Sequence, residues 1–529
     1  MLTENVPGVS DRVWHCAHES IADQDTCLFH TDPDDRPDDH DETRLFLETV
    51  RKAANKDSPF ESRRLLQFID AEFTELSLRG VTVGTEQNHA INLAAATIGE
   101  SDWTDARFIQ PIRFSHTTFL DDLTARDAHF ERVVGFRNAT FESVVNFRGA
   151  VFQAPAFFKH SRFTGQSIFW YARFEAHVNL RRTVFEDKAN FKTTDFADYA
   201  NFTTAEFRDQ TVFTLAEFDD DAEFTEATFA GIHDFNAALF NRITEFSGVV
   251  VDGPLDLSAA TFADLRLDPK RTKIADQCID LRECEITTGS LGQPVDGRVL
   301  YDLTDATIGD VQFTTPNSGA IADRVRFVRT RFDGFVFEND DLKPAATGWK
   351  LCDVFDEQLL PPDSREGPSV EARRQTFLNA KNGAQQTGNE TAASAFFYRE
   401  LTYRRQWYAE LARNADLPPA DRLWNLTRWL RNGTMMLLTG YGERPDRVVY
   451  ASVLTVSLFA GVYSLLLSTG EATAVDHLVF SFQSFVAFVP GTGIETSIRT
   501  VELVSSLQAF VGAFFIALFV FTFTRRINR

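Results

Sequence analysis

Phenylalanines recur along this chain with a spacing that fits neither an α-helix nor a single β-strand. Between residues 108 and 246 they stand at steps that alternate between six and five residues, and only Ala125 and Leu180 interrupt the series. Two residues before each of these positions lies a second inward candidate, usually Ala, Ser, Thr or Val. A five-residue register leads into the series from Phe73. The register fades after residue 246 and returns between residues 284 and 332.

A chain that turns a corner every five or six residues accounts for this spacing. On an α-helix, steps of five and six residues rotate by about 140° and 240°, so the phenylalanines would not share one face. On one long strand, a five-residue step would move the side chain to the opposite face. Four sides of five, six, five and six residues instead make a coil of about 22 residues, with one large and one small side chain inward on each side. Residues 73–262 would then form about nine coils stacked about 4.8 Å apart.

This pattern resembles the pentapeptide-repeat family, whose fold is a right-handed quadrilateral β-helix. The family motif places alanine two residues before a central leucine or phenylalanine, as in Ala71-Glu72-Phe73. The resemblance implies a β-helix over residues 70–345, with the phenylalanines as its packed core rather than as a binding surface. No P-loop, nucleophile elbow or dinucleotide-binding motif is visible there, so we do not expect an enzyme.

Two cysteines and two histidines stand close together in the N-terminal segment, residues 1–60. They are Cys16, His18, Cys27 and His30. Tetrahedral zinc accepts two thiolates and two imidazoles, so these residues are candidate ligands of a structural zinc ion, the one cofactor that the sequence suggests. The alternative is a tail in which they occur by chance. Residues 31–43 are acidic and contain proline, which is typical of a solvated linker.

Two uncharged apolar segments near the C-terminus, residues 448–467 and 503–524, are long enough to cross a membrane. Arginines precede the first and follow the second, whereas the connecting loop is mainly acidic. Under the positive-inside rule both termini are cytoplasmic, and the β-helix with them. We therefore expect a cell-membrane protein with a transmembrane domain over residues 446–529.

A third apolar segment lies between these two and is too short to span the membrane. It begins near Asp476 and ends at Pro490 and the glycines that follow. A short helix and a glycine-containing loop between two spans favour a re-entrant pore loop, because non-helical backbone at membrane depth must line water or pack in protein. The C-terminal dipole of such a helix would attract a cation.

This arrangement looks like the two-transmembrane pore module of the potassium-channel superfamily, with outer helix, pore helix, filter and inner helix. The resemblance implies a cation-conducting assembly of four copies. The family filter Thr-Val-Gly-Tyr-Gly falls on Ala487, Phe488, Val489, Pro490 and Gly491, where only the final glycine agrees. Potassium selectivity is therefore not predicted. Gly512, midway along the second span, is a candidate gating hinge or a point of close helix packing.

Between the β-helix and the membrane segments the composition becomes helical. Residues 365–445 read as a coupling region, with two helices joined at Gly388-Asn389. Residues 422–431 mix tryptophan, leucine and arginine, as a helix at the membrane interface would, although a helix packed on the rod has the same pattern. Gly440 is expected to end that helix.

The charge and composition of the chain limit the kinds of molecule that it is expected to bind. The 529 residues contain 76 Asp and Glu against 53 Lys and Arg, a formal charge of −23. Few of the cations are lysine, which together with the acidity is typical of a proteome adapted to high salt, as in a halophilic archaeon. Nucleic acid is not an expected partner. Some acidic pentapeptide-repeat proteins mimic DNA and inhibit topoisomerases, but adaptation to salt explains the acidity without mimicry.

The sequence favours two functions ahead of DNA mimicry, which stays as a third alternative. One is an ion-channel-like membrane protein, a homo-oligomer whose cytoplasmic β-helix senses or binds a protein partner. The other is a non-conducting scaffold that the two spans anchor in the bilayer. The first requires several copies, because one pair of spans cannot enclose a pore.

Overall fold

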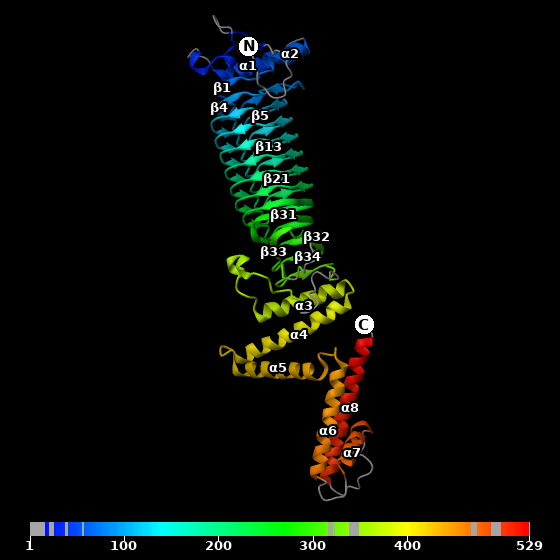
Figure 1. The fold of residues 1–529 in the computed structure, drawn as a ribbon. Coiled ribbons are helices and arrows are strands. Elements are labelled where there is room, and N and C mark those ends of the chain that lie inside the picture. Colours follow the sequence, from blue (N-terminus) through cyan, green and yellow to red (C-terminus); the bar gives the residue numbers. More distant parts are fainter. Residues whose placement is uncertain are drawn as a thin grey trace. The chain divides into compact units, whose positions relative to one another are not determined.

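The alternating steps of five and six residues fold into a β-solenoid of about 11 turns in the computed structural model of the chain (Figure 1). The structure describes residues 16–20, 26–36, 41–55, 58–315, 321, 323–337, 349–466, 473–487 and 499–527. Contacts divide the chain into two compact units, residues 1–367 and 368–529. The first contains an N-terminal cap and the solenoid, and the second is helical.

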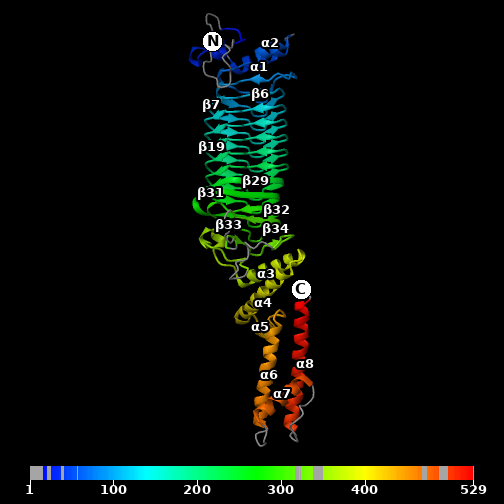
Figure 2. The ribbon, with the colours of Figure 1, turned by 45° about the vertical axis from the view of Figure 1, so that its right-hand side comes forward.

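Each turn of the regular solenoid is made of four short parallel strands. Strand β11 (Thr140–Phe141) pairs with β7 (Thr118–Phe119) before it and with β15 (Arg162–Phe163) after it, four strands away in each direction. Among the residues that the structure describes, the first strand is β1 (Glu72–Glu75) and the last is β36 (Arg331–Phe332). Figure 2 shows these strands stacked in register. The predicted β-helix is therefore present, while its square cross-section and right-handed sense stay predictions.

The phenylalanines form columns of parallel rings inside the solenoid, and this confirms that they are its core. Phe119, Phe141, Phe163 and Phe185 are stacked with centroid separations of 4.8, 4.6 and 5.0 Å, and neighbouring planes differ by at most 10°. None of the four is exposed by more than 1 %. The ring separation matches the spacing of hydrogen-bonded strands, so one ring fits each turn.

Alternate corners of the solenoid have different geometries. The five-residue steps contain a β-turn whose third residue has a positive φ, as at Asn138 (55°), where the Ala139 N–H donates to the Phe136 carbonyl at 3.0 Å. Glycine occupies the same place at Gly149 and Gly248. The six-residue steps turn instead by a bend without such a residue. The extra residue thus changes the corner and leaves the core register intact.

A leucine at one of the positive-φ corners leads to a first prediction. Leu215 has φ 57° and a half-exposed side chain. Asparagine tolerates this conformation better than leucine, which is disfavoured there by about 1 kcal/mol. We expect Leu215→Asn to raise the free energy of unfolding of the full chain by up to about 1 kcal/mol in chemical denaturation. Leu120→Asn is the control, because Leu120 is similarly exposed but lies outside these corners. Equal shifts in the two variants would contradict the argument.

The repeat does not fade where phenylalanine becomes scarce. After Phe246 the turns continue through longer strands, and aliphatic side chains such as Leu257 and Leu267 fill the core. The longer strands are β29 (Leu239–Val251), β31 (Thr261–Asp280), β32 (Glu285–Gly292), β33 (Asp296–Asp302) and β34 (Thr307–Thr314). The sequence pattern weakens there because β29 and β31 pair with register shifts, which change the spacing between inward residues.

Two helices at the N-terminal end of the solenoid were not predicted from the sequence. Helix α1 (Glu42–Ala54) starts at Asp41, whose side chain accepts a hydrogen bond from the Arg44 N–H at 2.8 Å. Helix α2 (Pro59–Leu65) follows it. The buried ring of Phe46 on α1 lies 4.9 Å from the ring of Phe68, next to the first strand. These helices cover part of the apolar end of the solenoid, as a terminal repeat requires.

The second unit contains six helices among the residues described. They are α3 (Val370–Gln386), α4 (Glu390–Arg413), α5 (Pro419–Thr439), α6 (Pro445–Leu466), α7 (Ala474–Ala487) and α8 (Arg499–Ile527). The break between α3 and α4 falls where the sequence predicts it, with φ 76° at Gly388 and Asn389 as the N-cap of α4. Gly440 ends α5 in a left-handed conformation, also as predicted.

Candidate functional site among the C-terminal helices

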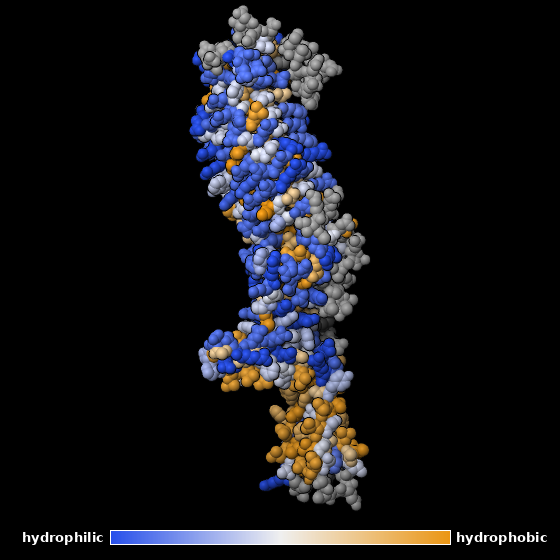
Figure 3. All heavy atoms as spheres, turned by 60° about the vertical axis from the view of Figure 1, so that its left-hand side comes forward, coloured by the Kyte–Doolittle hydropathy of each residue, from blue (hydrophilic) through white to orange (hydrophobic). Residues whose placement is uncertain are grey.

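Two helices of the second unit are long and apolar enough to cross a membrane, judged by length and composition. They are Pro445–Leu466 and Arg499–Thr524, and 18-residue stretches within them have mean hydropathies of 1.8 and 2.2. Most of their large side chains face outward; Tyr450 and Phe510, for example, are exposed to 71 % and 75 %. Figure 3 shows the hydrophobic colour concentrated on this part of the chain. An apolar exterior is what a lipid-facing helix needs and what a helix in a soluble core lacks.

The short helix α7 is held between α6 and α8 by a chain of buried hydrogen bonds. Ser481 on α7 donates to the Val456 carbonyl on α6 at 2.7 Å. Gln508 on α8 donates to the Ser481 carbonyl at 3.0 Å, and Tyr463 on α6 donates to the Gln508 side-chain oxygen at 2.8 Å. The side chains of Ser481, Gln508 and Tyr463 are fully buried. Polar groups in an apolar environment are costly unless paired, so this network fixes the position of α7.

A second contact brings α7 against α8 without any side chain between them. A Cβ atom added at Gly512 would overlap the carbonyl oxygen of Phe485 and lie 2.9 Å from its carbonyl carbon. Phe485 also packs in an apolar cluster with Val448, Val456 and Phe515. The observed geometry therefore supports close packing as the role of Gly512, and the hinge remains a prediction.

Of the five filter-like residues, the structure describes only Ala487. Ala487 is the last residue of α7, whereas Phe488, Val489, Pro490 and Gly491 fall outside the residues that the structure describes. With 14 residues, α7 is about 21 Å long and too short to cross the hydrocarbon. A further buried hydrogen bond runs from the Ser505 hydroxyl on α8 to the Ser484 hydroxyl on α7 at 3.3 Å. The sequence analysis did not single out these two serines, Tyr463 or Gln508. The signal available was the presence of polar residues in apolar segments, where such residues are often functional.

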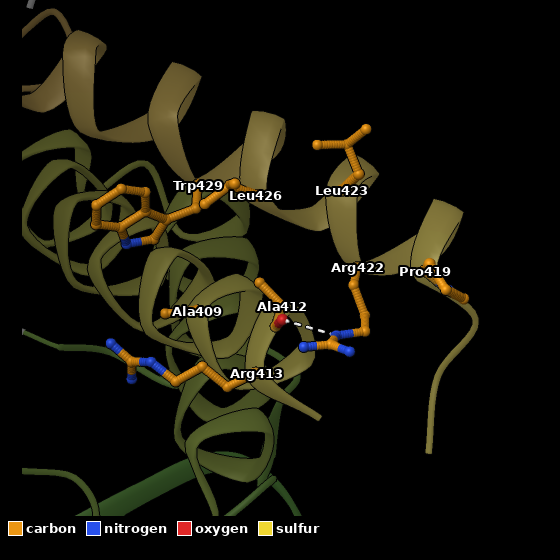
Figure 4. Close-up of a pocket in the computed structure, with 8 residues that line it drawn as sticks. All are labelled: Ala409, Ala412, Arg413, Pro419, Arg422, Leu423, Leu426 and Trp429. Atoms are coloured by element: carbon orange, nitrogen blue, oxygen red, sulfur yellow. Dashed lines mark hydrogen bonds between the residues drawn. The ribbon is translucent and has the colours of Figure 1, made fainter. Parts of the chain in front are cut away.

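Helix α5 presents an apolar face that its own unit leaves uncovered. A cavity of about 370 Å³ lies between the end of α4 and the start of α5, and Figure 4 shows the Arg422 guanidinium in it, which donates to the Ala412 carbonyl at 3.3 Å. The exposed large apolar residues of α5 are Leu423, Trp424, Leu426, Trp429, Leu430, Met435 and Leu437. Arg428 lies over the Trp424 ring at 5.1 Å. This combination suits a helix at a membrane surface.

The structure brings the four predicted zinc ligands together in the other unit. The sulfur of Cys16 lies 3.5 Å from that of Cys27 and 3.3 Å from His18 Nδ1. The sulfur of Cys27 lies 3.0 Å from His30 Nδ1. The pKa of the Cys16 thiol is lowered, first by its hydrogen bond with Cys27 and also by those with His18 and His30, against the effect of burial.

Comparison with known proteins bears on the solenoid alone. Residues 136–184 match the family model described as pentapeptide repeats (9 copies). No curated protein and no solved structure matches the chain. The matched residues lie in the regular part of the solenoid, where the phenylalanine columns and the four-strand turns are described above. The protein thus contains a pentapeptide-repeat domain, followed by a helical region in which two helices are long and apolar enough to span a membrane.

Proposed function

We propose that this protein is a membrane protein in which several copies of helices α6 to α8 surround a cation pore. The single observation that supports this most is the docking of α7, too short to span, between two helices long enough to do so. Its buried hydrogen bonds from Ser481 and Gln508 hold it as a pore helix must be held. The C-terminal end of α7 then carries a negative partial charge that stabilises a cation in the loop beyond it.

The distribution of charge supports cytoplasmic termini. The basic residues flanking the two spans are Arg444, Arg447, Arg525, Arg526 and Arg529, and the connecting segment holds Glu471, Asp476, Glu495 and Glu502 against Arg499. Under the positive-inside rule this places both ends of the chain in the cytoplasm. The solenoid is then a cytoplasmic sensor or scaffold that binds a protein partner.

An apolar groove on the helical unit supports assembly into a homo-oligomer. It lies between α6 and α7 and has a volume of about 480 Å³. Val453 and Phe482 line it and are exposed to 60 % and 57 %. A helix of a neighbouring copy would fill such a groove by side-chain packing. We propose four copies, the number in the channel superfamily that the sequence resembles.

Purification in detergent, followed by mass measurement and recording in a planar bilayer, tests the proposal. We expect a tetramer and a cation current that changes when Val489, Pro490 and Gly491 are replaced by alanine. Leu465→Ala is the matched control, because Leu465 is 79 % exposed on the apolar surface of α6 and should leave the current unchanged. A stable monomer without current would refute the channel.

The second candidate is a non-conducting scaffold whose two spans only anchor the solenoid. Its support is the segment after α7, where Val489 and Pro490 replace the glycine and the aromatic residue of the superfamily filter. Valine disfavours the unusual φ that glycine adopts there, and proline removes a backbone donor. This candidate predicts membrane localisation and no current at all, whether or not residues 489–491 are intact.

A further inference from the structure

The cluster at the N-terminal end of the chain has the dimensions of a metal site. In a tetrahedron with zinc–sulfur and zinc–nitrogen bonds of ordinary length, neighbouring ligand atoms lie about 3.4–3.8 Å apart. Within the cluster, the sulfurs of Cys16 and Cys27 lie 3.5 Å apart. The Cys16 sulfur lies 3.3 Å from His18 Nδ1, and the Cys27 sulfur lies 3.0 Å from His30 Nδ1. The ligand atoms of Cys16, His18 and Cys27 all lie within 4.8 Å of one another. His30 lies outside that group of three and joins the cluster through Cys27, so its ring must shift toward the other ligands to bind the same ion.

Both histidines are held in the tautomer that a metal requires. The Nε2 atom of His18 lies 3.0 Å from the Leu65 carbonyl oxygen, and that of His30 lies 2.8 Å from the Ile69 carbonyl oxygen. A carbonyl can only accept, so each Nε2 carries the proton that it donates. In the neutral form of each ring the lone pair is then on Nδ1, the atom that faces a cysteine sulfur. A histidine that binds a metal usually donates its other ring N–H to a carbonyl or carboxylate in this way, which fixes the orientation of the ring.

The surroundings of the cluster are those of a structural site. Cys27 is buried, and the His18 ring stacks on the Phe68 ring at 4.7 Å and meets the Phe29 ring at 5.2 Å. Phe29 and Phe68 are themselves buried. Four protein ligands fill the coordination of tetrahedral zinc and leave no open position for a substrate.

The two carbonyls that accept from the histidines belong to the chain entering the solenoid. Next to them, the Phe68 N–H donates to the Asn92 carbonyl at 2.7 Å and the Asp70 N–H donates to the Ala94 carbonyl at 2.9 Å. We propose that Cys16, His18, Cys27 and His30 bind one zinc ion that fastens the N-terminal segment over the first turn of the solenoid. The ion joins two pieces of chain that are too short and polar to pack by themselves.

A disulfide between Cys16 and Cys27 is the competing chemistry for two sulfurs at this distance. It would use neither imidazole, although the Nδ1 atom of each faces a sulfur. Metal binding uses all four residues, and it is therefore the interpretation that the geometry favours.

Metal analysis of the full-length protein, purified without chelator, tests the proposal. We expect one zinc per chain by mass spectrometry of the elements, and cobalt(II) in its place should give the visible absorption of a tetrahedral thiolate site. Cys16→Ser and His30→Gln should each lose at least tenfold in zinc affinity. Cys278→Ser is the control: Cys278 lies in β31, away from the cluster, and this variant should keep the zinc.

A second readout guards against variants that do not fold. Removal of zinc from the unmodified protein by a chelator should leave the circular dichroism of the solenoid intact and speed proteolytic cleavage before residue 66 several-fold, and added zinc should reverse this. A zinc-free protein with a Cys16–Cys27 disulfide in peptide mass spectra would overturn the proposal. Full zinc content in both Cys16→Ser and His30→Gln would overturn it as well.

Discussion

Replacement of Phe163 by alanine is expected to lower the free energy of unfolding by about 3–5 kcal/mol. The ring is fully buried and stacks on Phe141 at 4.6 Å and on Phe185 at 5.0 Å. The alanine would leave a cavity where the ring was, and this cavity cannot collapse, because backbone hydrogen bonds hold the strand on both sides of residue 163. The Arg162 N–H donates to the Ala139 carbonyl at 2.9 Å, and the Thr164 N–H donates to the Phe141 carbonyl at 2.8 Å. Chemical denaturation of the full chain, followed by circular dichroism, measures the loss.

The matched control for this substitution is Phe60→Ala. Phe60 lies on α2 and is 68 % exposed, with the Arg64 guanidinium 5.9 Å from its ring. Its removal should cost no more than about 1 kcal/mol. Phe163→Leu should fall between the two, because Leu180 already occupies such a core position without exposure. A loss in Phe163→Ala no larger than that in Phe60→Ala would show that the ring columns do not carry the stability of the solenoid.

Replacement of Gly512 by alanine is expected to push α7 away from α8. The helical units of several copies should then no longer associate into the proposed oligomer. The new Cβ atom would overlap the backbone carbonyl of Phe485, which cannot rotate away as a side chain could. Overpacking of this kind costs about 1–3 kcal/mol, and here it also acts on the hydrogen bonds that Gln508 donates to Ser481, one helical turn away. Size-exclusion chromatography with light scattering in detergent should show loss of the oligomer, and bilayer recording should show loss of any current.

Gly461→Ala is the control for the Gly512 substitution. Gly461 lies on α6, and a Cβ atom added there would meet nothing within 4 Å. That variant should assemble like the unmodified protein. The experiment also separates packing from gating: a hinge at Gly512 predicts an intact oligomer whose current opens and closes differently. Unchanged mass and unchanged stability in Gly512→Ala would contradict the packing role.

The solenoid could be predicted from the sequence, because its core residues recur at a short and regular spacing along the chain. The residues that fill it recur every five or six positions, so the inward side chains could be assigned from spacing alone. The prediction weakened after Phe246, where aliphatic residues replace the rings and where register shifts between β29 and β31 alter the spacing. Helices α1 and α2 were missed because the acidic segment before them obscured the N-cap at Asp41.

The residues of the candidate sites could be predicted from the sequence only in part. Cys16, His18, Cys27 and His30 could be named because few residue types bind zinc and all four lie close together in the sequence. Their support by the carbonyls of Leu65 and Ile69 depends on contacts between residues 39 to 47 positions apart, which no local pattern encodes. In the helical unit the apolar spans were evident, while the pairing of Tyr463 with Gln508 across two helices was not.

The amino-acid order by itself determined a coiled chain with an aromatic core and a C-terminal pair of membrane-length helices, since periodicity and hydropathy are properties of neighbouring residues. Only the tertiary structure decided where α7 is held, why Gly512 must lack a side chain, and which atoms of the two N-terminal histidines face the cysteines. Those features depend on hydrogen bonds and close contacts between distant segments, and such contacts exist only after the chain has folded.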